Sequence, residues 1–253
     1  MSSNIWMQCA GDSEIRPLQT VAWRVVESQH EVSTRKLVGS AAEQELLEHL
    51  LETVKPPAPE GKPTHYLLST PFRYPPLRHG SRFGARYERG LWYGSEQQRT
   101  AFAEVAFYRL LFLEGTEAAL APIIAPLTSF TVRMRSERSI DLTVPPFDAF
   151  TDRISARGSY IHSQPLGRAM REAHVDLVRF RSARDTSGGT NVAAYTPAVF
   201  RQAAPQRIER WYCTATRDAV DFTQSGVARV RTVHVFDRAQ FLVDGVLPMP
   251  VGA

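Results

Sequence analysis

Short β-type segments concentrated in the second half of the chain constrain the fold most. Runs rich in β-branched and aromatic residues lie at residues 130–134, 140–144, 175–180, 207–216 and 229–236. Runs of this length, bounded by polar and glycine-containing stretches, predict strands. No period of 20–50 residues recurs, which excludes a solenoid. Because the strands outnumber the helices and gather late, we expect an α+β fold rather than a doubly wound sheet.

Three helices are expected from the spacing of apolar residues. Residues 41–54 place their leucines on one stripe and their glutamates opposite, which predicts an amphipathic helix. Ser95 and Gln98 have the spacing of a capping box, so a second helix should begin at Ser95 and run to about Leu113. A third helix is expected at residues 163–173. Three further strands are expected, at residues 21–26, 65–69 and 91–93.

The chain is expected to form one domain after a short leader. Residues 1–20 lack clear periodicity and are interpreted as this leader. The proline-rich stretch KPPAPEGKP, residues 55–63, is the strongest break in the pattern. The 54 residues before it contain too few apolar positions for a core of their own. We therefore interpret it as a loop inside a single domain that spans residues 21–253.

The charge of the chain favours an anionic small ligand over a nucleic acid. The net charge is +4, and Lys36, Lys55 and Lys62 are the only lysines among 30 basic residues. Arginine, which makes up the rest, contacts phosphate and carboxylate groups through two parallel hydrogen bonds. The arginines are scattered among acidic residues and form no basic run, so binding of nucleic acid is not expected.

Missing motifs exclude other classes of protein. The seven histidines and two cysteines show no metal-ligand spacing, so no metal site is expected. The chain has no P-loop and no G-x-G-x-x-G, which argues against an ordinary nucleotide kinase or a Rossmann dehydrogenase. No apolar run approaches the ~20 residues that span a bilayer, and the start lacks a signal-peptide core. We therefore expect a cytoplasmic protein that does not associate with membranes.

Glu104 is the most informative single residue. Between Thr100 and Leu113 the only charged residues are Glu104 and Arg109, and Glu104 falls on an apolar helical face. A carboxylate in such a stripe is costly unless it meets a partner or a ligand. One interpretation is a structural ion pair with a core arginine. The other is a carboxylate held in a dry pocket to stabilise a developing positive charge.

Two glycine-containing segments could bring donors to an anionic group. Residues 80–84 (GSRFG) place Arg82 between glycines, where its guanidinium and nearby backbone N–H groups could contact a pyrophosphate. Residues 181–191 end a strand and enter a glycine-rich loop that lets the backbone approach a ligand. Ser182 could donate a hydrogen bond there, but no G-x-S-x-G surrounds it, so it is not a hydrolase nucleophile. A plain turn and a loop without function are the alternatives.

Taken in order, several stretches resemble the RES-domain family, which is named for an arginine, a glutamate and a serine. Residues 164–167 (QPLG) are similar to its Q-x-x-G helix start. Arg82, Tyr93 and Glu104 follow one another at equal steps of eleven residues, which is similar to the spacing in the family. The likeness covers residues 20–205, which leaves a C-terminal extension from about residue 205. The matching stretches are residues 23–26 (WRVV), 80–83 (GSRF), 90–95 (GLWYGS), 100–105 (TAFAEV) and 181–184 (RSAR).

The resemblance implies a fold and a site. The fold would be similar to that of ADP-ribosyltransferase toxins: a split, mixed β core with flanking helices and a cleft for NAD. Family members degrade NAD or transfer ADP-ribose to a protein, and their genes pair with an Xre-like antitoxin that occludes the cleft. By position, Arg82 would hold phosphate, Tyr93 would stack on nicotinamide and Glu104 would serve the ribose. Arg24 and Ser182 would complete the pocket.

The expected function is that of a toxin-type glycosyltransferase or hydrolase that cleaves the nicotinamide–ribose bond and depletes cellular NAD. NAD would be the substrate, no resident cofactor is expected, and inorganic phosphate is a candidate co-substrate. The alternatives are a mono-ADP-ribosyltransferase that modifies a cellular protein, and a binding module without catalysis. Residues 105–113 are too apolar to read a protein target, which favours water or phosphate as acceptor. Arginines beyond the need of one pyrophosphate are a hint of phosphorolysis.

Overall fold

The computed structural model of the protein describes most of the chain, namely residues 4–28, 38–54, 56, 65–76, 78–118, 120–225 and 231–252. Its helices are α1 (Ile5–Gln8), α2 (Ala41–Val54), α3 (Tyr66–Arg73), α4 (Gln98–Glu114), α5 (Thr151–Ile154) and α6 (Ser163–Glu172). Its strands are β1 (Arg16–Glu27), β2 (Trp92–Ser95), β3 (Ile123–Asp141), β4 (Leu177–Arg181), β5 (Thr190–Ala194), β6 (Gln206–Ala215), β7 (Ala219–Gln224) and β8 (Arg231–Asp237). The expected α+β class is confirmed.

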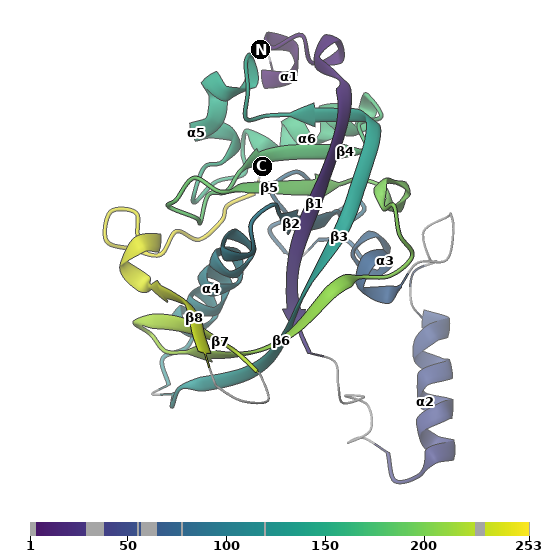
Figure 1. The fold of residues 1–253 in the computed structure, drawn as a ribbon, viewed down its shortest axis with the longest axis vertical. Helices are drawn as coiled ribbons and strands as arrows, with labels where there is room; N and C mark the ends of the chain where they lie inside the picture. Colours follow the sequence, from purple (N-terminus) through teal and green to yellow (C-terminus); the bar gives the residue numbers. More distant parts are fainter. Residues whose placement is uncertain are drawn as a thin grey trace.

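The strands form one mixed sheet in the order β1-β2-β5-β4-β3-β6-β7-β8, and β1 also pairs with β3. The extra pairing closes β1, β2, β5, β4 and β3 into a ring. Within it only β3 and β4 run parallel, through residues 139–141 and 177–179. The long strand β3 joins the two halves of the sheet, because its first part pairs with β6 and its middle part with β1. Figure 1 shows β1 and β3 crossing the layer of β4 and β5 at a steep angle.

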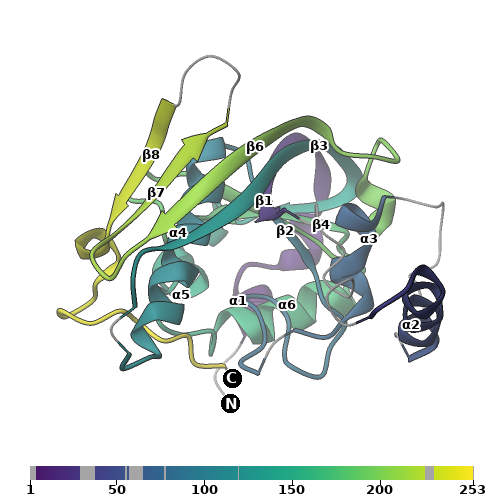
Figure 2. The same ribbon diagram turned by 90° about the horizontal axis from the view of Figure 1, so that it is seen from below.

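Three hydrophobic clusters hold the elements together. Helices α1 and α6 cover the face of β4 that carries Val178 and Phe180. Helix α4 packs on β6, β7 and β8, with the rings of Phe102 and Trp211 4.6 Å apart. The third cluster combines side chains of β1 and β3 with Leu177 and its neighbours on β2, β5 and α3. Figure 2 shows α4 between the β6–β8 arm and the rest of the molecule. Because successive strand residues point to opposite faces, β4 contributes to two different clusters.

Most of the predicted elements are confirmed. The helices expected at residues 41–54 and 163–173 are α2 and α6, and three late strands are β4, β6 and β8. The strand expected at residues 130–134 is part of the continuous strand β3. Of the strand expected at residues 140–144, only residues 140 and 141 belong to β3, and a turn follows them. The interpretation of residues 55–63 as a loop falls, apart from Pro56, outside the described residues.

One strand prediction is wrong. Residues 65–69, expected as a strand, lie at the start of α3. The side chain of His65 accepts the N–H of Leu67 at 3.2 Å and so caps the helix. A short apolar run is compatible with both a strand and a buried helix segment, and Leu68 and Phe72 show that here one helical face is buried.

The predicted start of α4 is also wrong. Ser95 does not cap the helix, because it is the last residue of β2 and the helix begins at Gln98. Its hydroxyl donates to Asn191 Oδ1 at 2.6 Å instead. Ser95 is therefore part of the sheet rather than of the helix terminus. The expected end of the helix near Leu113 agrees with the observed end at Glu114.

The N-terminal segment and α2 differ in how they pack. Within the predicted leader, α1 contributes Ile5 and Trp6 to the core and β1 already begins at Arg16. In contrast, α2 lies at the periphery in both views, and its Leu46 and Leu50 are exposed. In the described parts of the chain, no helix combines the length and apolar character needed to cross a bilayer.

Candidate active site

A cavity of about 1400 Å³ is lined by α4, β1, β2 and the loop that precedes β2. Four of the residues that the sequence predicted for the site line it: Arg24, Arg82, Tyr93 and Glu104. The fifth, Ser182, contacts Glu104 directly. The structure thus brings together all five predicted site residues from five separate stretches of sequence. Their roles toward a ligand stay predictions.

Glu104 is held through one of its two carboxylate oxygens. Ser182 Oγ and Asn191 Nδ2 donate to Oε1 at 2.7 and 2.6 Å. Ser95 donates to the amide oxygen of Asn191, which leaves the amide N–H₂ group facing the carboxylate. Among the described residues, none donates to Oε2 and none forms an ion pair with Glu104. The structural ion pair considered as an alternative is therefore not observed among the described residues, and Oε2 has no donor among them.

Ser182 connects this carboxylate to the loop after β4. Its hydroxyl donates to Glu104 and accepts the N–H of Asp185 at 3.1 Å. Asp185 in turn accepts a hydrogen bond of 2.6 Å from Thr100 on α4. A Cβ atom at Gly189 would lie 2.0 Å from the Thr100 hydroxyl, so this close approach requires glycine. The loop is thereby fixed against the helix that carries Glu104.

Arg82 lies on the cavity wall but is engaged with the backbone. Its Nη1 donates to the carbonyls of Ile154 at 2.8 Å and Ala156 at 3.1 Å, and Nη2 also donates to Ala156. Its guanidinium carbon is 5.2 Å from the centre of the Tyr160 ring. These contacts occupy donors that a phosphate would need. The hydrogen bonds to Ile154 and Ala156 therefore compete with the predicted role of Arg82 as the phosphate ligand.

Tyr93 and Arg24 also belong to the cavity wall. The Tyr93 hydroxyl donates to Ser81 Oγ at 3.0 Å and accepts the N–H of Phe83 at 3.1 Å. Burial raises the pKa of Tyr93 to about 12, so the phenol is neutral at physiological pH. Arg24 donates to the carbonyl of Tyr93 at 3.0 Å and lies 5.1 Å from the Trp92 ring. Burial lowers the pKa of Arg24 to about 10, which leaves it cationic at physiological pH.

Arg184 forms a buried part of the same wall. Its guanidinium carbon is 3.4 Å from the centre of the Phe107 ring, and its backbone N–H donates to Ser182 Oγ at 3.1 Å. Both terminal nitrogens are buried and have no hydrogen-bond partner. Burial lowers the pKa of Arg184, and the nearby charge of Glu104 opposes this shift. The carboxylate and the guanidinium thus influence each other without forming a hydrogen bond.

Sequence reasoning missed two participants. Asn191 lies on β5, a short strand that directly follows the glycine-rich loop and has no alternating pattern in the sequence. Tyr160 lies in a loop before α6 and gave no signal, yet its hydroxyl is 3.2 Å from that of Tyr108 on α4. Arg181, by contrast, is exposed, bonds to the carbonyl of Gly188 and does not line the cavity. The described residues contain no group of His, Cys, Asp or Glu side chains placed to hold a metal.

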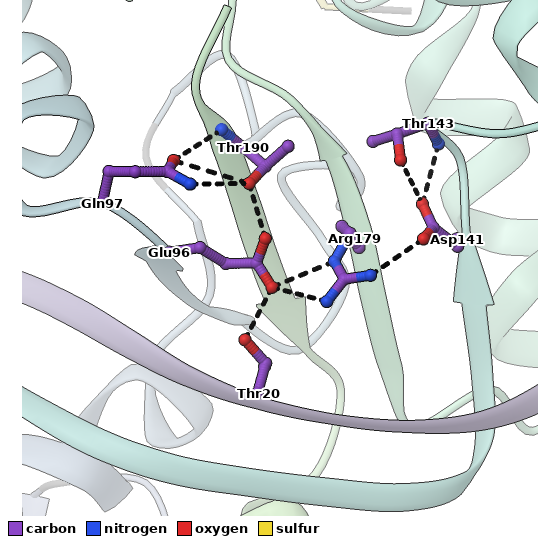
Figure 3. Close-up of polar contacts among 7 residues, drawn as sticks. All are labelled: Thr20, Glu96, Gln97, Asp141, Thr143, Arg179 and Thr190. Atoms are coloured by element: carbon purple, nitrogen blue, oxygen red, sulfur yellow. Dashed lines mark hydrogen bonds and ion pairs between the residues drawn. The ribbon is translucent and has the colours of Figure 1, made fainter.

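A second arginine–carboxylate cluster lies away from the cavity and is shown in Figure 3. Arg179 on β4 donates to Glu96 at 2.7 and 3.0 Å and to Asp141 at 3.0 Å. Thr20 and Thr190 each donate to Glu96 at 2.6 Å. Burial alone would raise the pKa of Glu96, but the hydrogen bonds from these threonines and from Arg179 outweigh it and lower that pKa. Sequence analysis did not predict this cluster.

The fold and the cavity define an α+β protein in which one mixed sheet and helix α4 position the Glu104 carboxylate among arginines and aromatic rings. Residues 58–215, more than half of the chain, match the family model of the RES domain, and the chain belongs to the RES-domain family. No curated protein matches the chain. Membership supports a toxin-like enzyme that acts on NAD, and it suggests an antitoxin as partner.

Proposed function

We propose that this protein cleaves the nicotinamide–ribose bond of NAD and passes ADP-ribose to water or inorganic phosphate. One observation carries the proposal: Glu104 is fixed through Oε1, while Oε2 has no partner among the described residues of the cavity wall. Two neutral donors hold the carboxylate in place without neutralising its charge. Such a carboxylate can stabilise a positive charge that develops close to it.

The chemistry requires little beyond this electrostatic contact. When the bond between ribose C1′ and the pyridinium nitrogen breaks, the electron pair moves to nicotinamide, which leaves as a neutral molecule. The ribose passes through an oxocarbenium-like state, whose positive charge a carboxylate stabilises. An oxygen of water or phosphate then bonds to C1′, and water releases a proton to solvent. No general acid is needed, so the protonated, neutral state of Tyr93 does not limit the reaction.

The cavity wall suits the nicotinamide and the pyrophosphate of NAD. The ring of Tyr93 offers a flat surface to the pyridinium, and cation–π attraction of this kind contributes roughly 0.5–2 kcal/mol. Arg24 and Arg184 add positive charge for the pyrophosphate. A volume of about 1400 Å³ accommodates a dinucleotide.

The decisive experiment is incubation of the pure full chain with NAD, with and without inorganic phosphate, followed by identification of the products. We expect free nicotinamide together with ADP-ribose, or with its 1″-phosphate when phosphate is present. NAD that stays intact under both conditions would favour a binding module without catalysis.

A labelled reaction separates the small-acceptor reaction from protein modification. The chain is supplied with NAD labelled in the ADP-ribose moiety together with cell extract. We expect the label in small molecules. Label on one discrete protein, in proportion to the nicotinamide released, would place mono-ADP-ribosylation first.

The proposed partner is an Xre-like antitoxin that covers the cavity. This proposal rests on family membership, since toxin–antitoxin pairing is typical of RES domains. We expect co-expression with such a protein to give a stable complex in which NAD consumption is suppressed. A complex that consumes NAD at the rate of the free chain would contradict occlusion of the cavity.

A further inference from the structure

We propose that Arg184 is the principal binding site for a phosphoryl oxyanion in the cavity. The inference rests on the proposed function for the identity of the ligand, but its structural basis is independent of catalysis. The side chain is 2% exposed and belongs to the cavity wall, yet both terminal nitrogens lack a hydrogen-bond partner. Among the described residues it is the only arginine with both of these nitrogens buried and unpaired.

An unpaired buried guanidinium is unfavourable, which makes a structural role a poor account of Arg184. Folded proteins hydrogen-bond nearly all buried polar atoms, and an ionised group loses more than a neutral one when it is desolvated. The contact with the Phe107 ring stabilises the charge but satisfies no N–H group. The nearby Glu104 directs its bonded oxygen to Ser182 and Asn191. The terminal N–H groups of Arg184 therefore have no acceptor among the described residues, and a bound oxyanion would supply one.

The loop around Arg184 holds the guanidinium in position. The backbone N–H of Arg184 donates to Ser182, and the next residue, Asp185, is tied to Thr100 on α4. The side chain is packed on Phe107 from the same helix. A planar fork fixed in this way matches the geometry of a phosphate better than a flexible surface cation does.

The ligand must displace a neighbouring side chain to reach these shielded nitrogens. Tyr108 is suited to this movement, because it is 50% exposed and its hydroxyl contacts that of Tyr160 at 3.2 Å. Both tyrosines and Arg184 line the same cavity. Opening of the Tyr108–Tyr160 contact would expose the guanidinium next to Glu104.

Two ligands carry the required chemistry, and binding measurements separate them. The oxyanion is either the pyrophosphate of the dinucleotide or a free inorganic phosphate that attacks C1′. Titration calorimetry of the full chain uses ADP-ribose for the first source and inorganic phosphate for the second. In Arg184→Gln we expect at least a ~10-fold loss of affinity for one of them. The probe that loses affinity identifies the source.

Two variants control for charge and folding. Arg181→Gln removes an exposed arginine at the end of β4, next to the loop, and should leave both affinities unchanged. Arg184→Lys keeps the charge but loses the planar guanidinium with its paired donors, so its affinity should lie between those of the wild type and Arg184→Gln. If Arg184→Gln does not fold, Arg184→Lys replaces it in the test.

The outcomes distinguish this inference from the proposed function. If wild-type protein binds neither probe, or if folded Arg184 variants bind both with unchanged affinity, the inference is overturned. If Arg184→Gln loses affinity while the wild type leaves NAD intact, the anion site stands and the NAD-cleaving function fails. If the site holds phosphate during turnover, Arg184→Lys should raise the KM for phosphate and leave the KM for NAD nearly constant.

Discussion

Two arginine–carboxylate clusters occupy opposite faces of the β4–β5 layer, and they differ in how fully their hydrogen bonds are satisfied. Arg179 and Thr190 point to the face of Leu177, whereas Asn191 points to the face of Phe180 and the cavity. On the first face, Arg179 is bonded to two carboxylates. On the second face, the terminal nitrogens of Arg184 have no partner and Glu104 has one oxygen without a donor.

The difference separates residues that stabilise the sheet from residues placed for a ligand. A completed network such as that of Arg179 and Glu96 connects β1, β3, β4 and β5 and gains nothing further from a ligand. An incomplete network such as that of Arg184 and Glu104 leaves charged atoms without hydrogen-bond partners in the described part of the chain, and a ligand can supply these partners. Substitutions in the first cluster should therefore change stability, and substitutions in the second should change binding and turnover.

The largest effect is expected for Glu104→Gln. The amide keeps the shape of the side chain but removes the charge, so the oxocarbenium-like state loses its electrostatic partner. We expect NAD turnover to fall by about 100-fold or more, which corresponds to about 3 kcal/mol. Glu96→Gln is the matched control on the other face and should retain turnover when folded. Equal loss of turnover in both variants would abolish the distinction between the clusters.

Arg179→Met should give the largest loss of stability. It leaves the carboxylates of Glu96 and Asp141 without their shared cation in a partly buried environment. We expect the free energy of unfolding to drop by roughly 2–3 kcal/mol, since removal of one partner leaves the other charges partly buried and unpaired. Denaturant unfolding measures this change. A loss below about 0.5 kcal/mol would show that the network behaves as a surface ion pair.

Arg184→Met should change stability in the opposite direction. Methionine keeps an apolar contact with Phe107 and removes a buried charge that has no hydrogen-bonded partner. We expect a gain of about 1 kcal/mol in the absence of ligand, together with loss of anion binding. Thermal unfolding in a phosphate-free buffer measures the gain. A clear loss of stability would mean that Arg184 is satisfied in the folded protein and belongs with the first cluster.

The smallest effect is expected from the titration of Glu96. Its pKa is lowered in the folded protein relative to its ordinary value of 4.5, so the unfolded chain binds the proton first as the pH falls. The contribution of Glu96 to stability is therefore present above pH 4.5 and is lost as the pH drops through the folded-state pKa. We expect wild-type stability to fall more steeply below pH 4.5 than that of Glu96→Gln. Parallel pH profiles would contradict the shift.

Glu104 shows how much of the candidate site could be predicted from the sequence. An isolated carboxylate on an apolar helical face predicted a residue with a special partner, and helical periodicity alone suffices for that inference. The resemblance of short stretches further indicated Arg24, Arg82, Tyr93 and Ser182. All four lie in or against the cavity. The sequence also predicted the α+β class, because strand and helix periods are local properties.

Only the tertiary structure decided which atoms meet. Ser95 has the spacing of a helix cap, but the register of β2 with β5 places it opposite Asn191 and gives its hydroxyl a different acceptor. The sequence does not show that the guanidinium of Arg184 lacks partners for its terminal nitrogens among the described residues while that of Arg82 is hydrogen-bonded. They differ because one faces backbone carbonyls of residues 154–156 and the other faces an aromatic ring. Hydrogen-bond partners far apart in the chain are set by strand register and packing, which local periodicity does not encode.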